Sequence, residues 1–292
     1  MSDQQPPARS RGVRAFVPRR RRSATVWLLL ALVVVAVAVP VLASTAPRGS
    51  RSGSVDVLYA GSLLTLMQQQ IDPAFHRATG YSVRGFANGS SALVAEIKGG
   101  VEVADVLLSA SPSADLALEG PANGEWITSY RVMGRSPLVL GYNPASAFAP
   151  ALRRRPWYDV VVRPGFVLGR TDPAVDPKGV LAVAALDGAA HRYRRPRLAA
   201  LARSSADVFS ETALVGELDA GQIDAGFFYG VEASAAHLHT VTLTGVHLGA
   251  TYTMALVNRA PHPAAARAFI SFLLGAQGRA ILRRHGITPP GP

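Results

Sequence analysis

The chain has 292 residues, a formal net charge of +11 and no cysteine. The lack of cysteine excludes disulfides, thiolate metal sites, a cysteine nucleophile and a lipid anchor on cysteine. Residues 1–50 hold eight arginines against one acid, which leaves 22 bases and 18 acids for the rest of the chain. A nucleic-acid-binding protein would carry its excess base on the folded body, so we expect no nucleic-acid partner.

The first 54 residues divide into three segments that precede the folded body. Residues 1–23 are a polar, basic arm that we place in the cytoplasm. Residues 24–44 include twenty uncharged residues, enough to cross a bilayer as a helix, and the arginines before them favour export of the remaining chain. This segment is either a cleaved signal peptide or an uncleaved signal anchor. Residues 45–54 have the composition of a linker.

From residue 55 onward, strand-like and helix-like patterns alternate, which is typical of βαβ units with parallel strands. The apolar run 55–60 stops at a small-residue turn, and a helical pattern continues from there up to residue 79. A similar turn at 88–91 opens a second helix, and the Asp-Pro steps at 172–179 precede another at 180–186. Further strands are expected at 81–87, 104–109, 136–142, 166–169, 223–229 and 251–258, and further helices at 115–119, 157–161, 207–217, 263–274 and 277–285, with a basic surface loop at 191–197.

These turns combine hydroxyl groups with the free amides of helix N-termini. Such amides lie next to the positive end of the helix dipole and form a binding site for anions. A site built only from neutral donors selects a fully deprotonated oxyanion, because that ligand accepts hydrogen bonds at every oxygen. Such a site requires no lysine or arginine. Ser62, Ser90 and Ser91 are the candidate donors, although Ser62 taken alone is equally explained as a helix N-cap.

Catalytic motifs are weak, so we expect no enzymatic activity, no cofactor and no free metal ion. Ser62 lies in AGSLL and not in a GxSxG elbow. The seven histidines lack HExxH spacing, and the closest pair, His237 and His239, is explained by a solvated loop. A membrane-anchored serine hydrolase or a sensor ectodomain is the alternative from another functional class.

Six segments, in this order, resemble the motifs of molybdate/tungstate-binding proteins, the extracytoplasmic solute-binding components of ABC transporters. They are YAGSL at 59–63, NGSSAL at 88–93, ADVLLSA at 104–110, WYDVVVRPGFVLG at 157–169, DPAVDPKG at 172–179 and DAGQIDAGFFYG at 219–230. The resemblance implies an α/β fold of the type II periplasmic-binding class, with two crossover segments and an oxyanion in the cleft between two lobes. Lobe 1 would comprise 55–135 and 249–292, and lobe 2 would comprise 136–248.

The resemblance also implies which residues hold the oxyanion. In the family, the serine of AGSL and a serine of the second turn bind its oxygens, which matches Ser62 and Ser90, with Ser91 competing for the second role. A tyrosine that contacts the ligand in the molybdate branch matches Tyr229.

One departure from the family pattern concerns the carboxylates. In the tungstate branch two carboxylates approach the metal of the oxyanion; Asp176 matches the first, whereas Phe228 stands at the second position. A lone carboxylate beside a dianion is repelled unless it ligates the metal or is protonated. We therefore expect a tetrahedral, hydrogen-bonded oxyanion, with Asp176 as a helix cap rather than a ligand to its metal.

The resemblance predicts a monomer that binds molybdate or tungstate outside the cytoplasm and delivers it to the permease of an ABC importer. Residues 24–44 would export the protein or anchor it in the membrane. Sulfate or another tetrahedral oxyanion is the alternative ligand, because the donor geometry is shared and selection then rests on the size of the cavity.

Overall fold

The computed structural model describes residues 53–290. The basic arm, the apolar segment at 24–44 and all but the last two residues of the linker lie outside the described residues, as do residues 291–292. The signal peptide or anchor therefore stays a prediction. Of the helices between residues 53 and 290, none is both long enough and apolar enough to cross a bilayer.

One sheet runs through the described chain, with the strand order β2-β1-β3-β9-β4-β7-β5-β6 and with β8 paired to β4. The strands are β1 Ser54–Ala60, β2 Ser82–Asn88, β3 Val106–Ser109, β4 Ile127–Tyr142, β5 Leu168–Thr171, β6 Val208–Phe209, β7 Ala225–Tyr229, β8 His239–Thr242 and β9 Gly249–Val257. Most of β1 and all of β3, β5 and β7 are buried, as expected for strands covered on both faces.

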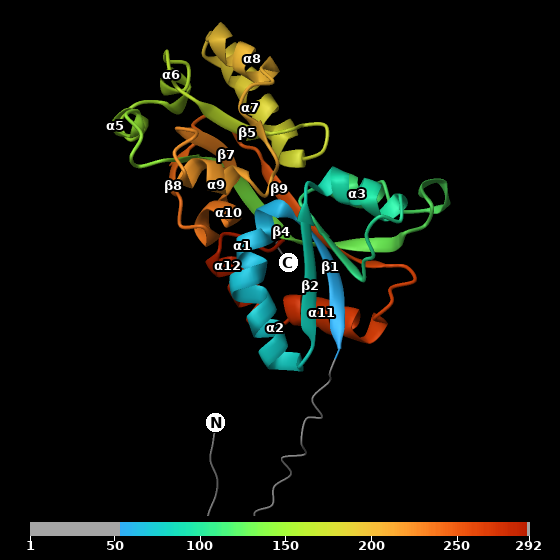
Figure 1. Ribbon diagram of the computed structural model, residues 1–292. Helices are drawn as coiled ribbons and strands as arrows, with labels where there is room; N and C mark the ends of the chain where they lie inside the picture. Colours follow the sequence, from blue (N-terminus) through green and yellow to red (C-terminus); the bar gives the residue numbers. More distant parts are fainter. Residues whose placement is uncertain (1–52, 291–292) are drawn as a thin grey trace, which may run out of the picture. The chain divides into compact units, whose positions relative to one another are not determined.

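Helices follow most of the strands (Figure 1). The α-helices are α1 Leu64–Leu66, α2 Asp72–Thr79, α3 Ser90–Lys98, α4 Pro112–Leu116, α5 Ala149–Leu152, α6 Trp157–Val160, α7 Pro177–Arg192, α8 Pro196–Arg203, α9 Leu214–Asp219, α10 Gly230–Ala235, α11 Pro263–Leu274 and α12 Ala276–Arg284. Two short 3-10 turns, η1 Gly61–Leu63 and η3 Pro121–Asn123, and the π-helical segment η2 Met67–Ile71 complete the set. The predicted helix after β1 is therefore η1, α1, η2 and α2 in succession, and it ends at Gly80, whose φ is 81°.

The sheet is mixed: it contains the parallel βαβ units that the alternating pattern predicted, and antiparallel pairs join them. Strand β1 pairs in parallel with β2 and β3, and β5 pairs in parallel with β6 and β7. The middle of the sheet is antiparallel, because β9 pairs with β3 and β4, and β4 pairs with β7 and β8. The local βαβ units were thus predicted correctly, whereas the antiparallel pairings join segments that no local pattern connects.

Strands β4 and β9 link the two ends of this sheet. The first part of β4 pairs with β9, with two register shifts, and its last five residues, 138–142, pair with β7. In Figure 1 these two strands run between the part that carries α5 to α9 and the part that carries β1, β2, α2 and α11. The predicted strand at 136–142 is therefore the second half of a 16-residue strand.

Two predicted segments on the side of β5 were wrong. The basic loop at 191–197 is mostly helical, because α7 continues to Arg192 and α8 begins at Pro196. The helix predicted at 207–217 begins only at Leu214. Before it, Val208 and Phe209 form β6 against β5, as suits a β-branched and an aromatic residue. Residues 210–213 therefore form a loop between β6 and α9.

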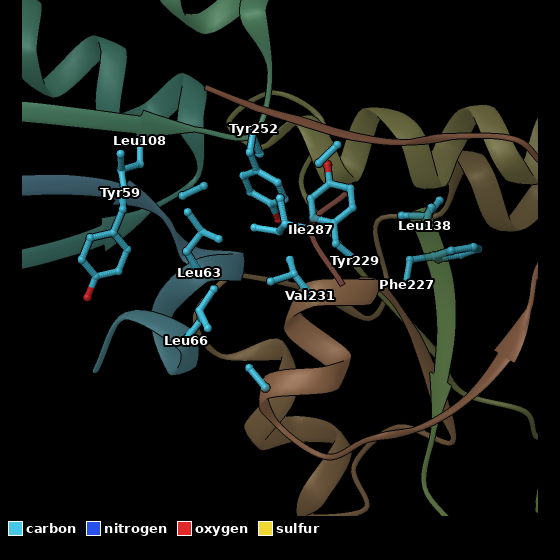
Figure 2. Packing of buried hydrophobic residues seen from close by; sticks show 14 of the residues in the cluster. Tyr59, Leu63, Leu66, Leu108, Leu138, Phe227, Tyr229, Val231, Tyr252 and Ile287 are labelled. Atoms are coloured by element: carbon cyan, nitrogen blue, oxygen red, sulfur yellow. The ribbon is translucent and has the colours of Figure 1, made fainter. Parts of the chain in front are cut away.

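Buried aromatic side chains connect the helices and strands. Phe75 of α2 meets Phe269 of α11 edge-on, with ring centroids 5.1 Å apart. Figure 2 shows the rings of Tyr229 and Tyr252 next to each other near Ile287, in the largest buried cluster. These two tyrosines come from β7 and β9, so the cluster continues across the middle of the sheet.

Candidate functional site

Ser62 lies in η1, directly after β1, and only 2% of its surface is exposed. Its Oγ is 2.8 Å from Oη of Tyr252, a residue of β9 that lies 190 positions later in the chain. The N-cap of η1 is Ala60 and that of α1 is Leu63. Ser62 therefore caps neither helix, and the simpler interpretation of this serine is wrong.

The structure separates the two serines of the second turn. Ser90 is the first residue of α3 and is fully buried, and its Oγ accepts a hydrogen bond of 3.0 Å from the amide of Ala110. The hydrogen of this hydroxyl remains able to donate to a ligand. Ser91 is exposed. Of these two candidates, Ser90 is the one that faces the protein interior.

Asp176 is the N-cap of α7, in agreement with the expected capping role. Its Oδ1 accepts a hydrogen bond of 2.9 Å from the amide of Lys178. Its Oδ2 is buried and has no hydrogen-bond partner among the described residues. One carboxylate oxygen thus caps the helix while the other remains free for a further partner.

The turns before α3 and α7 contact each other. The amide of Ala92 donates to the carbonyl oxygen of Val175 at 3.3 Å. A Cβ on Gly89 would lie 2.3 Å from this carbonyl oxygen and 3.1 Å from Cβ of Asp176. Only glycine at position 89 lets the two turns approach so closely. Their contact brings Ser90 and Asp176 close to each other.

Tyr229 and Tyr252 bring two hydroxyl groups into the interior, and their rings pack edge-on with centroids 5.9 Å apart. Oη of Tyr252 meets Ser62, whereas Oη of Tyr229 is buried without a hydrogen-bond partner among the described residues. Burial, together with nearby carboxyl groups, raises the pKa of both hydroxyls well above its ordinary value. Both tyrosines therefore keep their protons and can donate them in hydrogen bonds.

A buried ion pair lies beside these hydroxyls, although the predicted site required no lysine. Nζ of Lys178 is 2.9 and 2.8 Å from the two carboxylate oxygens of Glu232, and both side chains are almost fully buried. Burial opposes the charge of Lys178, but Glu232, Glu211 and Asp176 outweigh it, so the pKa of the lysine is raised. The ammonium group is therefore charged, and a lysine stands among these residues that the sequence pattern did not indicate.

Glu211 supplies another carboxyl group from the loop between β6 and α9. Its Oε2 accepts a hydrogen bond of 2.6 Å from the amide of Gly61, at the start of η1. Its Oε1 is buried without a hydrogen-bond partner and lies 3.7 Å from Nζ of Lys178. Burial raises the pKa of Glu211 to about 8, and the charge of Asp176 contributes to this rise. The expectation of a single carboxylate was therefore wrong.

Phe228 brings no carboxyl group to this arrangement, although the centroid of its ring lies 5.6 Å from Nζ of Lys178. It is fully buried in a separate apolar cluster with residues such as Leu214 and Ile223. A further carboxyl group near Asp176 comes instead from Glu211, 17 positions before Phe228 and on a different part of the chain.

Together these residues form what we call the buried polar cluster. Its members are Ser62, Ser90, Asp176, Lys178, Glu211, Tyr229, Glu232 and Tyr252. Three of its oxygens, on Asp176, Glu211 and Tyr229, are buried and have no hydrogen-bond partner within residues 53–290. Unpaired buried polar atoms are unfavourable, so several in one place indicate a site for a small polar ligand.

Four members of the cluster escaped prediction for different reasons. Tyr252 was predicted only as part of the strand at 251–258. Lys178 stands inside the DPKG motif but was interpreted only as part of a turn. Glu232 comes three positions after Tyr229, and its Oε2 accepts from the amide of Tyr229 at 3.3 Å, so capping-box spacing was an available signal. Glu211 lay within a helix predicted wrongly, and no sequence signal pointed to Gly61.

Comparisons with known proteins agree with this fold. A relative from Haloferax volcanii, whose name proposes molybdenum binding for an ABC transporter, is 30% identical over 183 residues. That alignment covers 62% of this chain and 57% of the Haloferax protein, so the matched region spans less than two thirds of that relative. The molybdate/tungstate-binding protein WtpA of Pyrococcus abyssi is 22% identical over 302 residues, covering 83% of this chain and 87% of WtpA.

Among solved structures, the periplasmic molybdate-binding protein of Azotobacter vinelandii matches with a TM-score of 0.62 and 19% identity. The match covers 81% of this chain and all of that protein, and it shows the mixed α/β fold of periplasmic binding proteins. The sequence profile of the family described as bacterial extracellular solute-binding protein matches residues 55–288. The chain therefore belongs to this family of extracellular solute-binding proteins.

Proposed function

We propose that this protein binds molybdate or tungstate in the buried polar cluster and delivers the oxyanion to the permease of an ABC importer. The observation that carries the proposal is a group of buried donors: the hydroxyl of Tyr229, which has no hydrogen-bond partner among the described residues, together with the hydroxyls of Ser62 and Ser90. The names of the relatives from Haloferax and Pyrococcus support the choice of oxyanion.

The cluster offers both donors and a positive charge to such a ligand. The hydroxyls of Ser62, Ser90 and Tyr229 can donate to oxyanion oxygens, and hydrogen bonds to a charged acceptor are stronger than neutral ones. Lys178 adds a positive charge that the sequence alone did not lead us to expect. Since a deprotonated oxyanion only accepts hydrogen bonds, this set of donors matches it.

A hydrolase is less well supported than a binding protein. The hydrogen-bond partner of Ser62 is Tyr252, whose pKa is raised by burial, and a protonated tyrosine is a poor base for activating a serine. We therefore assign Ser62 to ligand binding.

We further propose that the protein closes around its ligand. The predicted lobes, 55–135 with 249–292 and 136–248, meet at several contacts, among them those of Gly61 with Glu211 and of Gly89 with Val175. Because the cluster is buried, these contacts have to open before an anion can enter. Residues 24–44 would place the protein, which we propose to be a monomer, outside the cytoplasm, either by export or as a membrane anchor.

Isothermal titration calorimetry with molybdate, tungstate, sulfate and phosphate tests the proposal. We expect one molybdate or tungstate to bind per chain, and a ligand at 100 times its Kd to add about 2.7 kcal/mol to the free energy of unfolding. Binding of sulfate or phosphate without molybdate or tungstate would reassign the ligand. Binding of none of the four would refute an oxyanion-binding function.

A further inference from the structure

We propose that Glu211 takes part in ligand binding as a neutral carboxylic acid, which donates a hydrogen bond to the oxyanion through Oε1. Through Oε2 it accepts the hydrogen bond from the amide of Gly61. The inference rests on the proposed function, because it takes an oxyanion as the ligand. It adds a residue and a proton to the site.

The carboxyl group of Glu211 lies at the turn where the ligand is expected to bind. Glu211 is only 4% exposed, and Oε2 lies 2.6 Å from the amide that begins η1, next to Ser62. A Cβ on Gly61 would lie 2.8 Å from this Oε2, so the carboxyl group packs directly on the turn. An amide at a helix N-terminus would otherwise be available to an anion. The side chain of Glu211 therefore lies against the amide that is expected to bind the ligand.

The other carboxyl oxygen of Glu211, Oε1, is available to a ligand. Oε1 has no hydrogen-bond partner among the described residues, and its distance of 3.7 Å from Nζ of Lys178 is too long for a hydrogen bond. The lysine makes its two short contacts with Glu232 instead. If Oε1 carries a proton, it becomes a donor that lacks an acceptor until a ligand arrives.

The charges around Glu211 favour that proton. The titratable groups that face it from the neighbouring elements are Asp176 and Lys178 of α7, Tyr229 of β7, Glu232 of α10 and Tyr252 of β9. With every carboxyl group ionised, three negative charges would face a single ammonium group, and a dianion would add two more in a site screened from water. Protonation of Glu211 removes one of them, in agreement with its pKa of about 8.

This proton makes binding depend on pH. Below about pH 8 the neutral acid is the dominant form and donates to the ligand. Above that value Glu211 ionises, loses its donor and places a negative charge beside the dianion. Only the protonated fraction then binds, so the apparent Kd rises roughly tenfold for each further pH unit, and binding takes up one proton.

The test is calorimetric titration of the wild-type protein and Glu211→Gln with molybdate and tungstate from about pH 6.5 to about pH 9.5. Glutamine keeps a carbonyl oxygen for Gly61 and an amide donor in place of the acid, but it cannot ionise. We expect Glu211→Gln to bind within a few-fold of wild type at neutral pH and to show no loss above pH 8. Asp219→Asn removes an exposed charge from α9 and serves as the matched control, which should keep the wild-type pH profile.

A second measurement uses the wild-type protein alone. Titrations above pH 8 in buffers with different ionisation enthalpies report proton uptake, which we expect to approach one proton per ligand bound. A pH profile of Glu211→Gln identical to wild type, or binding without proton uptake, would overturn the role of Glu211 while leaving the proposed function intact. Failure of the wild-type protein to bind either oxyanion at any pH would overturn the proposed function and this inference together.

Discussion

A substitution of Tyr229 should affect the stability of the fold and the affinity for the ligand in different ways. Its hydroxyl is fully buried without a hydrogen-bond partner among the described residues, so the folded protein bears the cost of its desolvation. Tyr229→Phe should therefore leave the free energy of unfolding unchanged or raise it by about 1 kcal/mol, while the affinity for molybdate falls. Urea denaturation and calorimetry on the same variant measure the two effects. A destabilised variant with unchanged affinity would assign the hydroxyl to the core.

Ser62 differs from Tyr229 because its hydroxyl already has a partner. Ser62→Ala should weaken ligand binding by roughly 1.5 to 3 kcal/mol through loss of a hydrogen bond to a charged ligand. It should also destabilise the fold, by about 1 to 3 kcal/mol, since Oη of Tyr252 is left buried and unpaired.

A double variant separates these two losses. The variant that combines Ser62→Ala with Tyr252→Phe lacks both hydroxyls of this pair, so neither is left without its partner. Most of the stability should therefore return, while ligand affinity stays low. Chemical denaturation and titration of the three variants form the measurement. Recovery of affinity in the double variant would contradict a direct contact between Ser62 and the oxyanion.

At the scale of elements, the contact between the turns before α3 and α7 decides whether the site can close. In Gly89→Ala the new Cβ would lie only 2.3 Å from the carbonyl oxygen of Val175. This distance is too short for two atoms that are not bonded, so the two turns have to separate. We expect at least a tenfold loss of affinity for the oxyanion with a smaller change in stability, because the turns lie at the ends of helices and not inside the core.

The chain offers a matched control for this substitution. Gly188 lies inside α7, and a Cβ there would meet nothing within 4 Å. Gly188→Ala should raise stability by roughly 0.5 to 1 kcal/mol, as for other glycines within helices, and leave affinity unchanged. Equal affinities in the two alanine variants, measured by titration, would show that the turns need not close on the ligand.

The individual elements were largely predictable, whereas the partners across the site were not. The turn of Ser62, the cap at Asp176 and the strand that ends in Tyr229 could all be inferred from neighbouring residues, since strand, turn and capping patterns are local. The contact between Lys178 and Glu232 joins positions 54 residues apart, and that between Gly61 and Glu211 joins positions 150 apart. Their pairing depends on how β4 and β9 cross the sheet, which no local pattern specifies.

At the scale of the whole molecule, buried carboxyl groups make stability depend on pH above neutrality. The folded protein raises the pKa of Glu211 from 4.5 to about 8 and, through burial, that of Asp72 from 3.8 to about 7. The folded state therefore holds protons that the unfolded state releases, and stability falls as pH rises towards 8. Burial lowers the pKa of His285 below 6.5, which has the opposite effect but only below that value.

The clear window for this effect is therefore pH 6.5 to 8. There the free energy of unfolding should fall with rising pH, by up to about 1.4 kcal/mol per pH unit for each proton involved. Denaturation in urea across this range measures the slope, and Asp72→Asn combined with Glu211→Gln should flatten it. A rise in stability over the same window would show that these carboxyl groups are ionised in the folded protein.

The hydrogen bond between Gly61 and Glu211 has a kinetic consequence. It is a short contact between positions 150 residues apart, at a buried side chain of the proposed site. If this contact opens before the ligand enters, as proposed, capture is a two-step process, and the observed association rate should stop increasing at high ligand concentration. Deuterium exchange at the amide of Gly61 should then report the free energy of opening in the empty protein.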